Sequence, residues 1–331
     1  MIELGYTLSS EEFPPLALVK HARMAEDAGF TFALISDHYH PWVDAQGHSP
    51  FVWSTIGGVA ATTDRIRIGT GVTCPTVRIH PAIIAQAAAT CAAMLPGRFF
   101  LGVGTGENLN EHITGERWPS ANVRREMLEE AVWILRKLWT GENVDHEGAF
   151  YQVVDARIYT LPETPPEIYI AASGGMAAQL AGEIGDGLIA TSPSEKLVQS
   201  FEQSGGQGKP KYAQVTVCWA EDEASARKTA HEIWPNAAIT GELSAELPLP
   251  RHFEQAAKMV TEDDTAKSIV CGPDPAKHIE KIRAYADAGY DHIYVHQVGP
   301  GQEGCVRFYQ REVMPQLGDL LVEQQRRRRV A

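Results

Sequence analysis

Short apolar runs and longer amphipathic stretches alternate along nearly the whole chain. An apolar run of four to eight residues is typical of a buried strand, whereas an apolar stripe that recurs every three to four residues indicates a helix. The pattern predicts eight strands, at Glu3–Leu8, Phe32–Ser36, Ile66–Thr70, Arg98–Val103, Ile168–Ala171, Gly187–Ala190, Tyr212–Cys218 and His292–His296.

Helical patterns fill the intervals between these strands. They predict helices at Pro15–Ala28, Pro50–Thr62, Pro81–Met94, Val123–Thr140, Gly175–Ile184, Lys196–Gly205, Asp222–Trp234, Pro275–Ala288 and near Gly304–Gly318. Four of them begin with Pro, which is tolerated in a first helical turn. Eight strands, each followed by a helix, predict an α/β protein with a parallel (β/α)₈ TIM barrel. The alternative is a doubly wound open sheet, which usually has fewer strands.

Three segments interrupt this alternation. Residues 105–122 read as a long loop, residues 143–160 as a β-hairpin that turns at Glu147-Gly148, and residues 235–265 as an insertion. Loops after the C-terminal ends of barrel strands build the active site. We therefore expect one barrel domain over residues 1–320 and a basic tail over residues 321–331, whose four arginines we interpret as a solvated chain end.

Composition narrows the classes of partner. The formal net charge of −13 disfavours binding to nucleic acid or to anionic membranes. The five cysteines are scattered without a Cys-x-x-Cys pair, which argues against a zinc cluster or a disulfide framework. No leader pattern and no membrane-spanning apolar run is found. These features predict a cytoplasmic protein that binds a small-molecule substrate and no metal.

The candidate chemistry lies where predicted strands end. The second strand runs into Asp37-His38, with Trp42 four residues later, and the fourth runs into Gly104-Thr105-Gly106-Glu107. An imidazole and a carboxyl group at one barrel mouth suit the transfer of a proton across a substrate. The alternative for His38 is a histidine satisfied within a turn, and two glycines in a strand-to-helix turn are common.

Other strand ends carry glycines and hydroxyl groups. Ser173-Gly174-Gly175 precedes a helix whose free N–H groups could bind phosphate, with Thr191 nearby. Gly71-Val72 after the third strand would let the backbone approach a planar ring. The alternative for Ser173-Gly174-Gly175 is a plain tight turn, and the alternative for Gly71 is a β-bulge.

Taken together, Ser-Asp-His-x-x-Pro-Trp, Gly-Thr-Gly-Val, Gly-Val-Gly-Thr-Gly-Glu-x-Leu-Asn and Ala-Ala-x-Gly-Gly make the chain similar to the bacterial-luciferase-like oxidoreductases that use the deazaflavin coenzyme F420. The branch it resembles most contains F420-dependent glucose-6-phosphate dehydrogenases. The resemblance extends from Gly5 to about Leu317. It implies a homodimer, coenzyme F420 rather than FMN, and hydride transfer between C5 of the deazaflavin and an alcohol or hemiacetal carbon.

The resemblance also implies residue roles. His38 would be the base that takes the hydroxyl proton, Glu107 the acid at the ring and Trp42 the indole packed over the reacting carbon. At Gly71-Val72 the family carries a bulge or a non-prolyl cis bond. The implied coenzyme contacts are Asp37, Gly71, Val72, Gly104, Thr105, Gly106, Asn110, Ser173, Gly174, Gly175, Met176 and Thr191.

Substrate recognition departs from the resemblance. The glucose-6-phosphate enzymes hold phosphate with two Lys and one Arg, where this chain has Ser194, Ser244 and Lys267, with Lys196 close by. Losing charge-assisted contacts weakens phosphate binding, so a sugar or sugar phosphate other than glucose 6-phosphate is expected. Three alternatives remain: a reductase of a carbonyl or activated alkene, an FMN-dependent monooxygenase, and a catalytically idle barrel that binds coenzyme.

Overall fold

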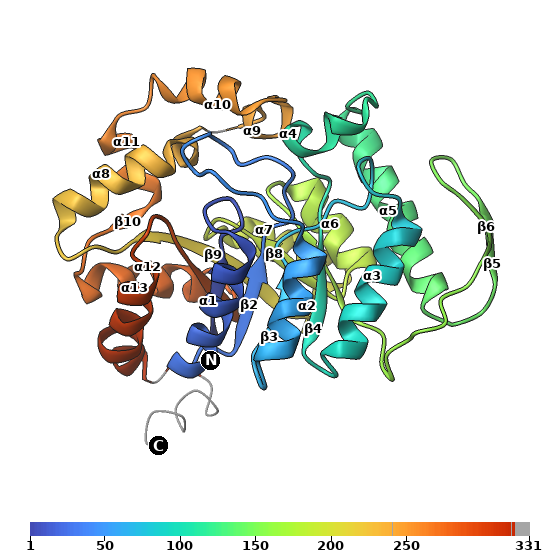
Figure 1. The fold of residues 1–331 in the computed structure, drawn as a ribbon, viewed down its shortest axis with the longest axis horizontal. Helices are drawn as coiled ribbons and strands as arrows, with labels where there is room; N and C mark the ends of the chain where they lie inside the picture. Colours follow the sequence, from blue (N-terminus) through green and yellow to red (C-terminus); the bar gives the residue numbers. More distant parts are fainter. Residues whose placement is uncertain (240, 319, 322–331) are drawn as a thin grey trace.

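A closed ring of eight parallel strands forms the centre of the computed structural model, which describes residues 1–239, 241–318 and 320–321 (Figure 1). The ring order is β9-β11-β1-β2-β3-β4-β7-β8, and a β8–β9 pairing closes it. Its strands are β1 Glu3–Leu8, β2 Phe32–Ile35, β3 Arg67–Thr70, β4 Phe99–Val103, β7 Ile168–Ala171, β8 Gly187–Ala190, β9 Lys211–Cys218 and β11 His292–Gln297. The predicted TIM barrel and all eight of its strands are confirmed.

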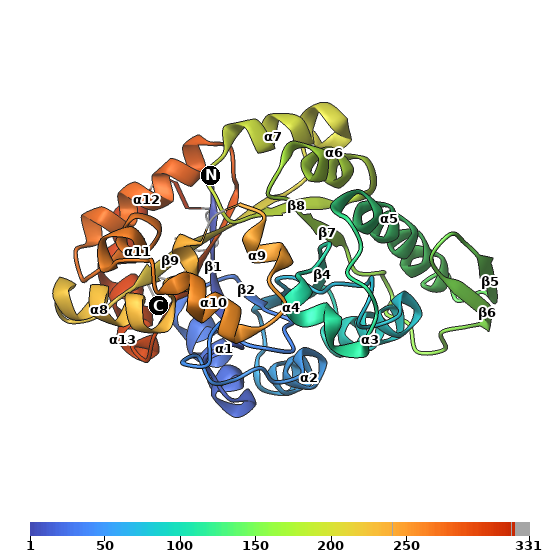
Figure 2. The same ribbon diagram turned by 90° about the horizontal axis from the view of Figure 1, so that it is seen from above.

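Helices surround the ring (Figure 2). They are α1 Pro15–Ala28, α2 Val52–Thr62, α3 Pro81–Met94, α5 Ala121–Leu138, α6 Gly175–Ile184, α7 Glu195–Phe201, α8 Glu223–Ile233, α12 Pro275–Asp287 and α13 Gln302–Phe308. Proline occupies the first turn of α1, α3 and α12 as predicted. The prediction for Pro50 is wrong, because α2 begins after Phe51, which adopts an extended backbone as its N-cap.

The barrel interior is filled by aromatic side chains at the end where the strands begin. Phe32, Phe100, Tyr169 and Tyr212 are buried there and pack against one another. A Cβ atom on Gly5 or Gly69 would collide with the ring of Phe32 or Phe100, which explains glycine in these two strands. Outward-facing residues of the same strands pack against the helices in the main core. The barrel is therefore closed at this end, and its cavity opens at the other.

The three interrupting segments have structure of their own. The predicted hairpin is confirmed as β5 Val144–Glu147 and β6 Gln152–Ala156, an antiparallel pair that projects beside α5 (Figure 2). Residues 105–122 contain α4 Asn108–Glu111 and a 3₁₀ turn at His112–Thr114. Residues 235–271 contain a 3₁₀ turn at Pro235–Ala238, α9 Leu243–Glu246, α10 Pro250–Ala257, α11 Glu262–Ser268 and β10 Val270–Cys271, which pairs with β9.

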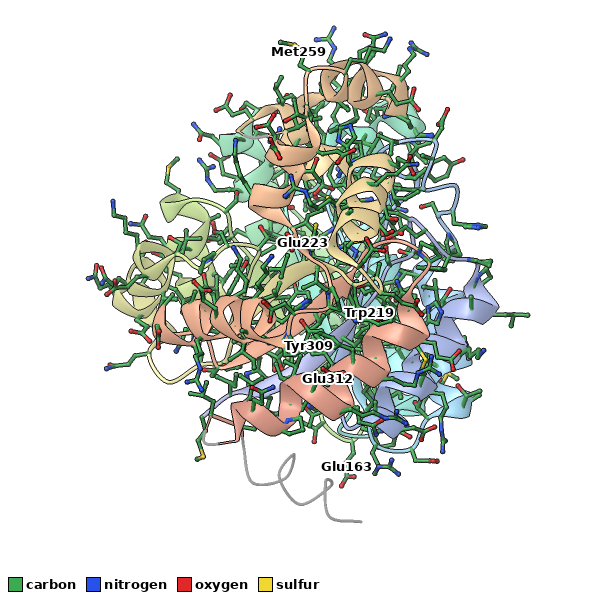
Figure 3. The ribbon with its side chains drawn as sticks, turned by 90° about the vertical axis from the view of Figure 1, so that its left-hand side faces the viewer. Glu163, Trp219, Glu223, Met259, Tyr309 and Glu312 are labelled. Atoms are coloured by element: carbon green, nitrogen blue, oxygen red, sulfur yellow. The ribbon has the colours of Figure 1, made fainter. Side chains whose placement is uncertain are left out.

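The insertion lies at the end of the barrel where the strands finish. Figure 3 places Met259, just after α10, at one end of the molecule, and Glu163, in the loop before β7, at the opposite end. Seen from above, α9 and α10 lie over the ring of strands (Figure 2). The insertion therefore covers part of the barrel mouth. The predicted tail lies outside the described residues, apart from Leu321.

Within the described residues, no helix is both long and apolar enough to cross a membrane.

Candidate active site

A cavity of about 350 Å³ opens at the mouth of the barrel. Side chains alternate between the two faces of a strand, so every second residue of a barrel strand faces the barrel interior, and those near the strand ends face this space. The lining residues are Thr7, Glu11, Ser36, His38, Trp42, Gly71, Val72, Gly104, Thr105, Gly106, Glu107, Ala171, Ala172, Ser173, Ile189, Ala190, Thr191, Gln214, Trp234, Ser244, Ala245, Tyr294 and His296. Ten of the predicted site residues lie among them: His38, Trp42, Gly71, Val72, Gly104, Thr105, Gly106, Glu107, Ser173 and Thr191. Ser244 is the eleventh.

His38 is paired with a carboxylate that the sequence analysis missed. Glu11 follows β1 in the segment Ser9-Ser10-Glu11, is 3% exposed, and places Oε1 3.3 Å from Nδ1 of His38. The hydroxyl of Ser36 donates to Oε2 of Glu11 at 2.7 Å. A carboxylate behind an imidazole orients the ring and stabilises its positive charge when the other nitrogen takes a proton. The signal was present, because Glu11 follows a strand end just as His38 does.

Trp42 forms the adjacent wall of the cavity. Its ring lies 5.1 Å from the imidazole of His38 at an interplanar angle of 67°. Phe253 of α10 packs edge-on against the other part of the indole, with ring centroids 5.1 Å apart. The insertion therefore holds Trp42 in place beside His38.

Glu107 lines the cavity at the end of β4. Asn110, one turn into α4, donates through Nδ2 to Oε2 of Glu107 at 3.4 Å. Its Oδ1 accepts from the backbone N–H groups of Tyr39 at 2.9 Å and His40 at 3.1 Å. Asn110 is buried outside the cavity lining and joins the His38 loop to the Glu107 segment, so its contact with the coenzyme ring stays a prediction.

Asp37 also turns away from the cavity. Its carboxylate accepts from Thr73 Oγ1 at 2.8 Å and from Arg78 Nη2 at 2.9 Å. Arg78 also donates to Glu111. Burial raises the pKa of Glu111, and the Arg78 cation lowers it in part. These contacts give the Asp37 side chain a structural role, because a buried carboxylate needs a charged partner, and its coenzyme contact stays a prediction.

Small residues line the wall formed by the ends of β3, β4 and β7. The peptide bond between Gly71 and Val72 is cis, as the resemblance allowed. A Cβ on Gly104 would lie 2.8 Å from Cγ2 of Val72 and 3.4 Å from Cβ of Ala171, and one on Gly71 would lie 3.0 Å from Leu34. Glycine is therefore required at both positions by close packing within the wall itself.

The start of α6 adjoins this wall through Ser173. A Cβ on Gly174 or Gly175 would meet no atom within 4 Å, so the N–H groups of this helix start are open to a ligand. Gly174, Gly175 and Met176 lie outside the cavity lining itself. Met176 is exposed, with its sulfur 3.6 Å from Nη2 of Arg125.

Three predicted substrate residues do not reach the cavity. Ser194 caps α7 and accepts from the N–H of Leu197, and Lys196 is exposed in the first turn of that helix. Lys267 pairs with Asp264 at 2.8 Å and lines a separate surface depression between α8, α11 and α12, so its contact with the substrate stays a prediction. Thr265 of α11 is buried, so Lys267, two residues later, points outward.

The polar floor of the cavity comes from strand interiors. Thr7, Gln214 and His296 line it, and no candidate chemistry was predicted for them. His296 sits edge-on to Trp234, with ring centroids 4.6 Å apart. Polar residues at inward positions of otherwise apolar strands were the available signal. No group of His, Cys, Asp and Glu in the described ranges could hold a metal ion.

Comparisons with known proteins identify the family of the chain. A model of the luciferase-like monooxygenase family matches residues 1–292. A protein of Segniliparus rotundus named F420-dependent glucose-6-phosphate dehydrogenase is 37% identical over 332 residues, covering 96% of this chain and 99% of its own. A protein of the same name from Microbacterium testaceum is 38% identical, covering 96% and 97%.

Solved structures show the same architecture. An F420-dependent secondary alcohol dehydrogenase in complex with an F420-acetone adduct superimposes with a TM-score of 0.87 at 28% identity, over 95% of this chain and 98% of that one. The coenzyme F420-dependent tetrahydromethanopterin reductase from Methanopyrus kandleri shares the fold, with a TM-score of 0.77 at 22% identity over 95% and 99%.

Proposed function

The chain belongs to the luciferase-like monooxygenase family, and from this premise we propose that it binds coenzyme F420 and oxidises a secondary alcohol or hemiacetal carbon. One observation carries the proposal. His38, with Glu11 behind it, faces the same cavity as Glu107 and a wall of glycines and alanines. That arrangement provides a base, a second proton site and a flat space for a ring in one enclosure.

The residues fit the coenzyme that the relatives' names specify. Gly71, Gly104 and Ala171 line the cavity and add little side-chain bulk to it, which suits a planar ring, and the N–H groups at the start of α6 suit a phosphate on its tail. Bound there, the deazaflavin would supply a hydride acceptor at C5. Thr105 and Gly106 lie beside this space, at the end of β4.

The chain's own residues handle the proton. His38 takes the hydroxyl proton as the substrate carbon loses hydride, so the alcohol becomes a carbonyl compound. Glu11 stabilises the imidazolium that forms, because its carboxylate lies 3.3 Å from Nδ1. Glu107 lines the same cavity and would serve as the second proton site, and Trp42 would exclude water beside the imidazole. Run backwards, the same groups would serve a reductase, so the physiological direction stays a prediction.

Coenzyme choice is tested by fluorescence titration of the purified protein. We expect saturable quenching of deazaflavin fluorescence and weaker binding of FMN. A preference for FMN would contradict the proposal and support the FMN-dependent monooxygenase alternative.

The role of His38 is tested by His38→Ala. We expect a loss of about 10²- to 10⁴-fold in alcohol oxidation with coenzyme affinity retained. His48→Ala is the matched control, because His48 is exposed on the same loop and does not line the cavity. Equal turnover in the two variants would rule out His38 as the base.

The homodimer stays a prediction.

A further inference from the structure

We infer that the cavity selects an uncharged substrate with a second hydroxyl group, and that the side-chain oxygen of Gln214 accepts a hydrogen bond from that hydroxyl. The inference rests on the proposed function and names the substrate class of the same cavity. It points to a free sugar or another polyol, and it excludes the corresponding phosphate ester.

Charge is the first argument. The carboxyl groups of Glu11 and Glu107 lie in the cavity wall, and none of the described residues that line it is Lys or Arg. The nearby cation Arg78 is buried and engaged by Asp37 and Glu111. Phosphate sites depend on cationic hydrogen-bond donors. A phosphate ester would instead meet two carboxyl groups without a cation to balance them.

The orientation of the Gln214 amide is the second argument. Its Nε2 lies 3.3 Å from Thr216 Oγ1 and 3.2 Å from Nδ1 of His296. Burial lowers the pKa of His296 to about 4, so the ring is neutral at physiological pH. A neutral ring that accepts at Nδ1 donates at Nε2, which lies 3.3 Å from the hydroxyl of Ser9.

This network uses both amide hydrogens of Gln214. Oε1 accepts no hydrogen bond from the part of the chain that the structure describes, and Gln214 lines the cavity. A carbonyl oxygen held in this way accepts a hydrogen bond from a hydroxyl donor and repels an anion. His296 is therefore a positioning residue for Gln214.

The surroundings of Gln214 match a polyol. Thr7 Oγ1, on the same polar floor, is buried without a partner in the described structure. Trp42 and Trp234 provide apolar faces on the mouth side of the cavity, which suit the C–H face of a sugar ring. Hydroxyl groups below and C–H groups above would satisfy both surfaces, whereas a simple alcohol would leave Gln214 and Thr7 unpaired.

The experiment compares free aldoses and polyols with their phosphate esters, and with propan-2-ol, by loss of deazaflavin absorbance. We expect wild-type kcat/KM to be at least about 10-fold higher for a free sugar than for its ester. Gln214→Leu should lower kcat/KM for the polyol by about 10- to 100-fold, which corresponds to about 1.4 to 2.8 kcal/mol for the lost buried hydrogen bond. The loss for propan-2-ol should be at least about tenfold smaller.

Several outcomes would overturn the inference: a preference for the ester, propan-2-ol turned over as well as polyols, or equal losses on both substrates in Gln214→Leu. If that variant does not fold, Thr7→Val, which keeps the side-chain shape, gives the same comparison. Ser244→Lys adds a cation to the lining and should raise kcat/KM for the ester relative to the free sugar. If no alcohol of either class reduces the coenzyme, the proposed function fails instead.

Discussion

Replacing Glu11 by Gln removes the negative charge behind His38 and keeps much of the local packing. Gln has nearly the same shape, and its amide oxygen can still accept from the Ser36 hydroxyl, which lies 2.7 Å from Oε2 in the wild type. The change therefore isolates what the carboxylate charge contributes to proton transfer.

The geometry bounds the effect. Two unit charges 3.3 Å apart interact by about 5 kcal/mol at an effective dielectric constant of about 20. Desolvation of the buried carboxylate offsets part of this energy, and hydrogen bonds to charged groups have a net worth of about 1.5–3 kcal/mol. At about 1.4 kcal/mol per tenfold change in rate, we expect Glu11→Gln to lower kcat/KM by about 10- to 150-fold.

The assay follows deazaflavin absorbance over a series of alcohol concentrations from below to above KM, and a separate fluorescence titration measures coenzyme affinity. We expect the loss in kcat/KM while coenzyme affinity changes little, because Glu11 lies on the His38 side of the cavity. Ser36→Ala is the matched control. It removes one hydrogen bond to Glu11 but leaves the charge, and should cost less than about tenfold. A Glu11→Gln enzyme within twofold of wild type would refute the assigned role.

Three further predictions concern stability. Burial raises the pKa of Glu12 from 4.5 to about 8, so the folded chain binds this proton more tightly than the unfolded chain does. The free energy of unfolding therefore falls as pH rises from 4.5 to about 8, by at most about 1.4 kcal/mol per pH unit. In urea unfolding at pH 5, 7 and 8, the free energy of unfolding of Glu12→Gln should change less with pH than that of the wild type. The same change with pH in both proteins would contradict this. Arg78→Leu leaves two buried carboxyl groups without their cation and should lower the free energy of unfolding, measured in urea, by about 3–5 kcal/mol. Arg78→Lys should recover part of that loss. An unchanged urea midpoint in Arg78→Leu would contradict a stabilising role for these ion pairs. Gly106→Ala should lower the melting temperature by several degrees, because Gly106 has φ of +76° and a Cβ there would lie 2.5 Å from Cys74 Sγ. Gly97 is also at positive φ, but a Cβ there would meet no atom within 4 Å, so Gly97→Ala should lower the melting temperature less.

Local sequence determined most of the barrel. Runs such as Phe32–Ile35 and Ile168–Ala171 are apolar on both faces because helices cover one face and the barrel interior takes the other. The insertion was not predictable in the same way. Its helices α9 to α11 are four to eight residues long, too short for periodicity to show, so the position of Lys267 could not be foreseen.

The site was predictable where chemistry follows a strand end. His38 and Glu107 were found by that rule, and Glu11 satisfies it as well. Gln214 and His296 lie inside strands, where a polar residue is ordinarily read as facing solvent. Their inward orientation follows only from barrel closure, which pairs β9 with both β8 and β11. The protein partners of the Asp37 and Asn110 side chains were not predictable, because tertiary structure brings Arg78 and the His38 loop backbone to them.

The aromatic plug at the strand-start end makes the cavity a well with a fixed depth. Phe32, Phe100, Tyr169 and Tyr212 stop any ligand from threading through the barrel. A molecule whose reacting carbon sits beside His38 can therefore be lengthened only toward the rim, past Ser244 and Ala245 of α9. Substrate length is thus set by the outward path and not by the volume at the bottom, so changes in α9 should alter which chain lengths are accepted while the reaction itself stays the same.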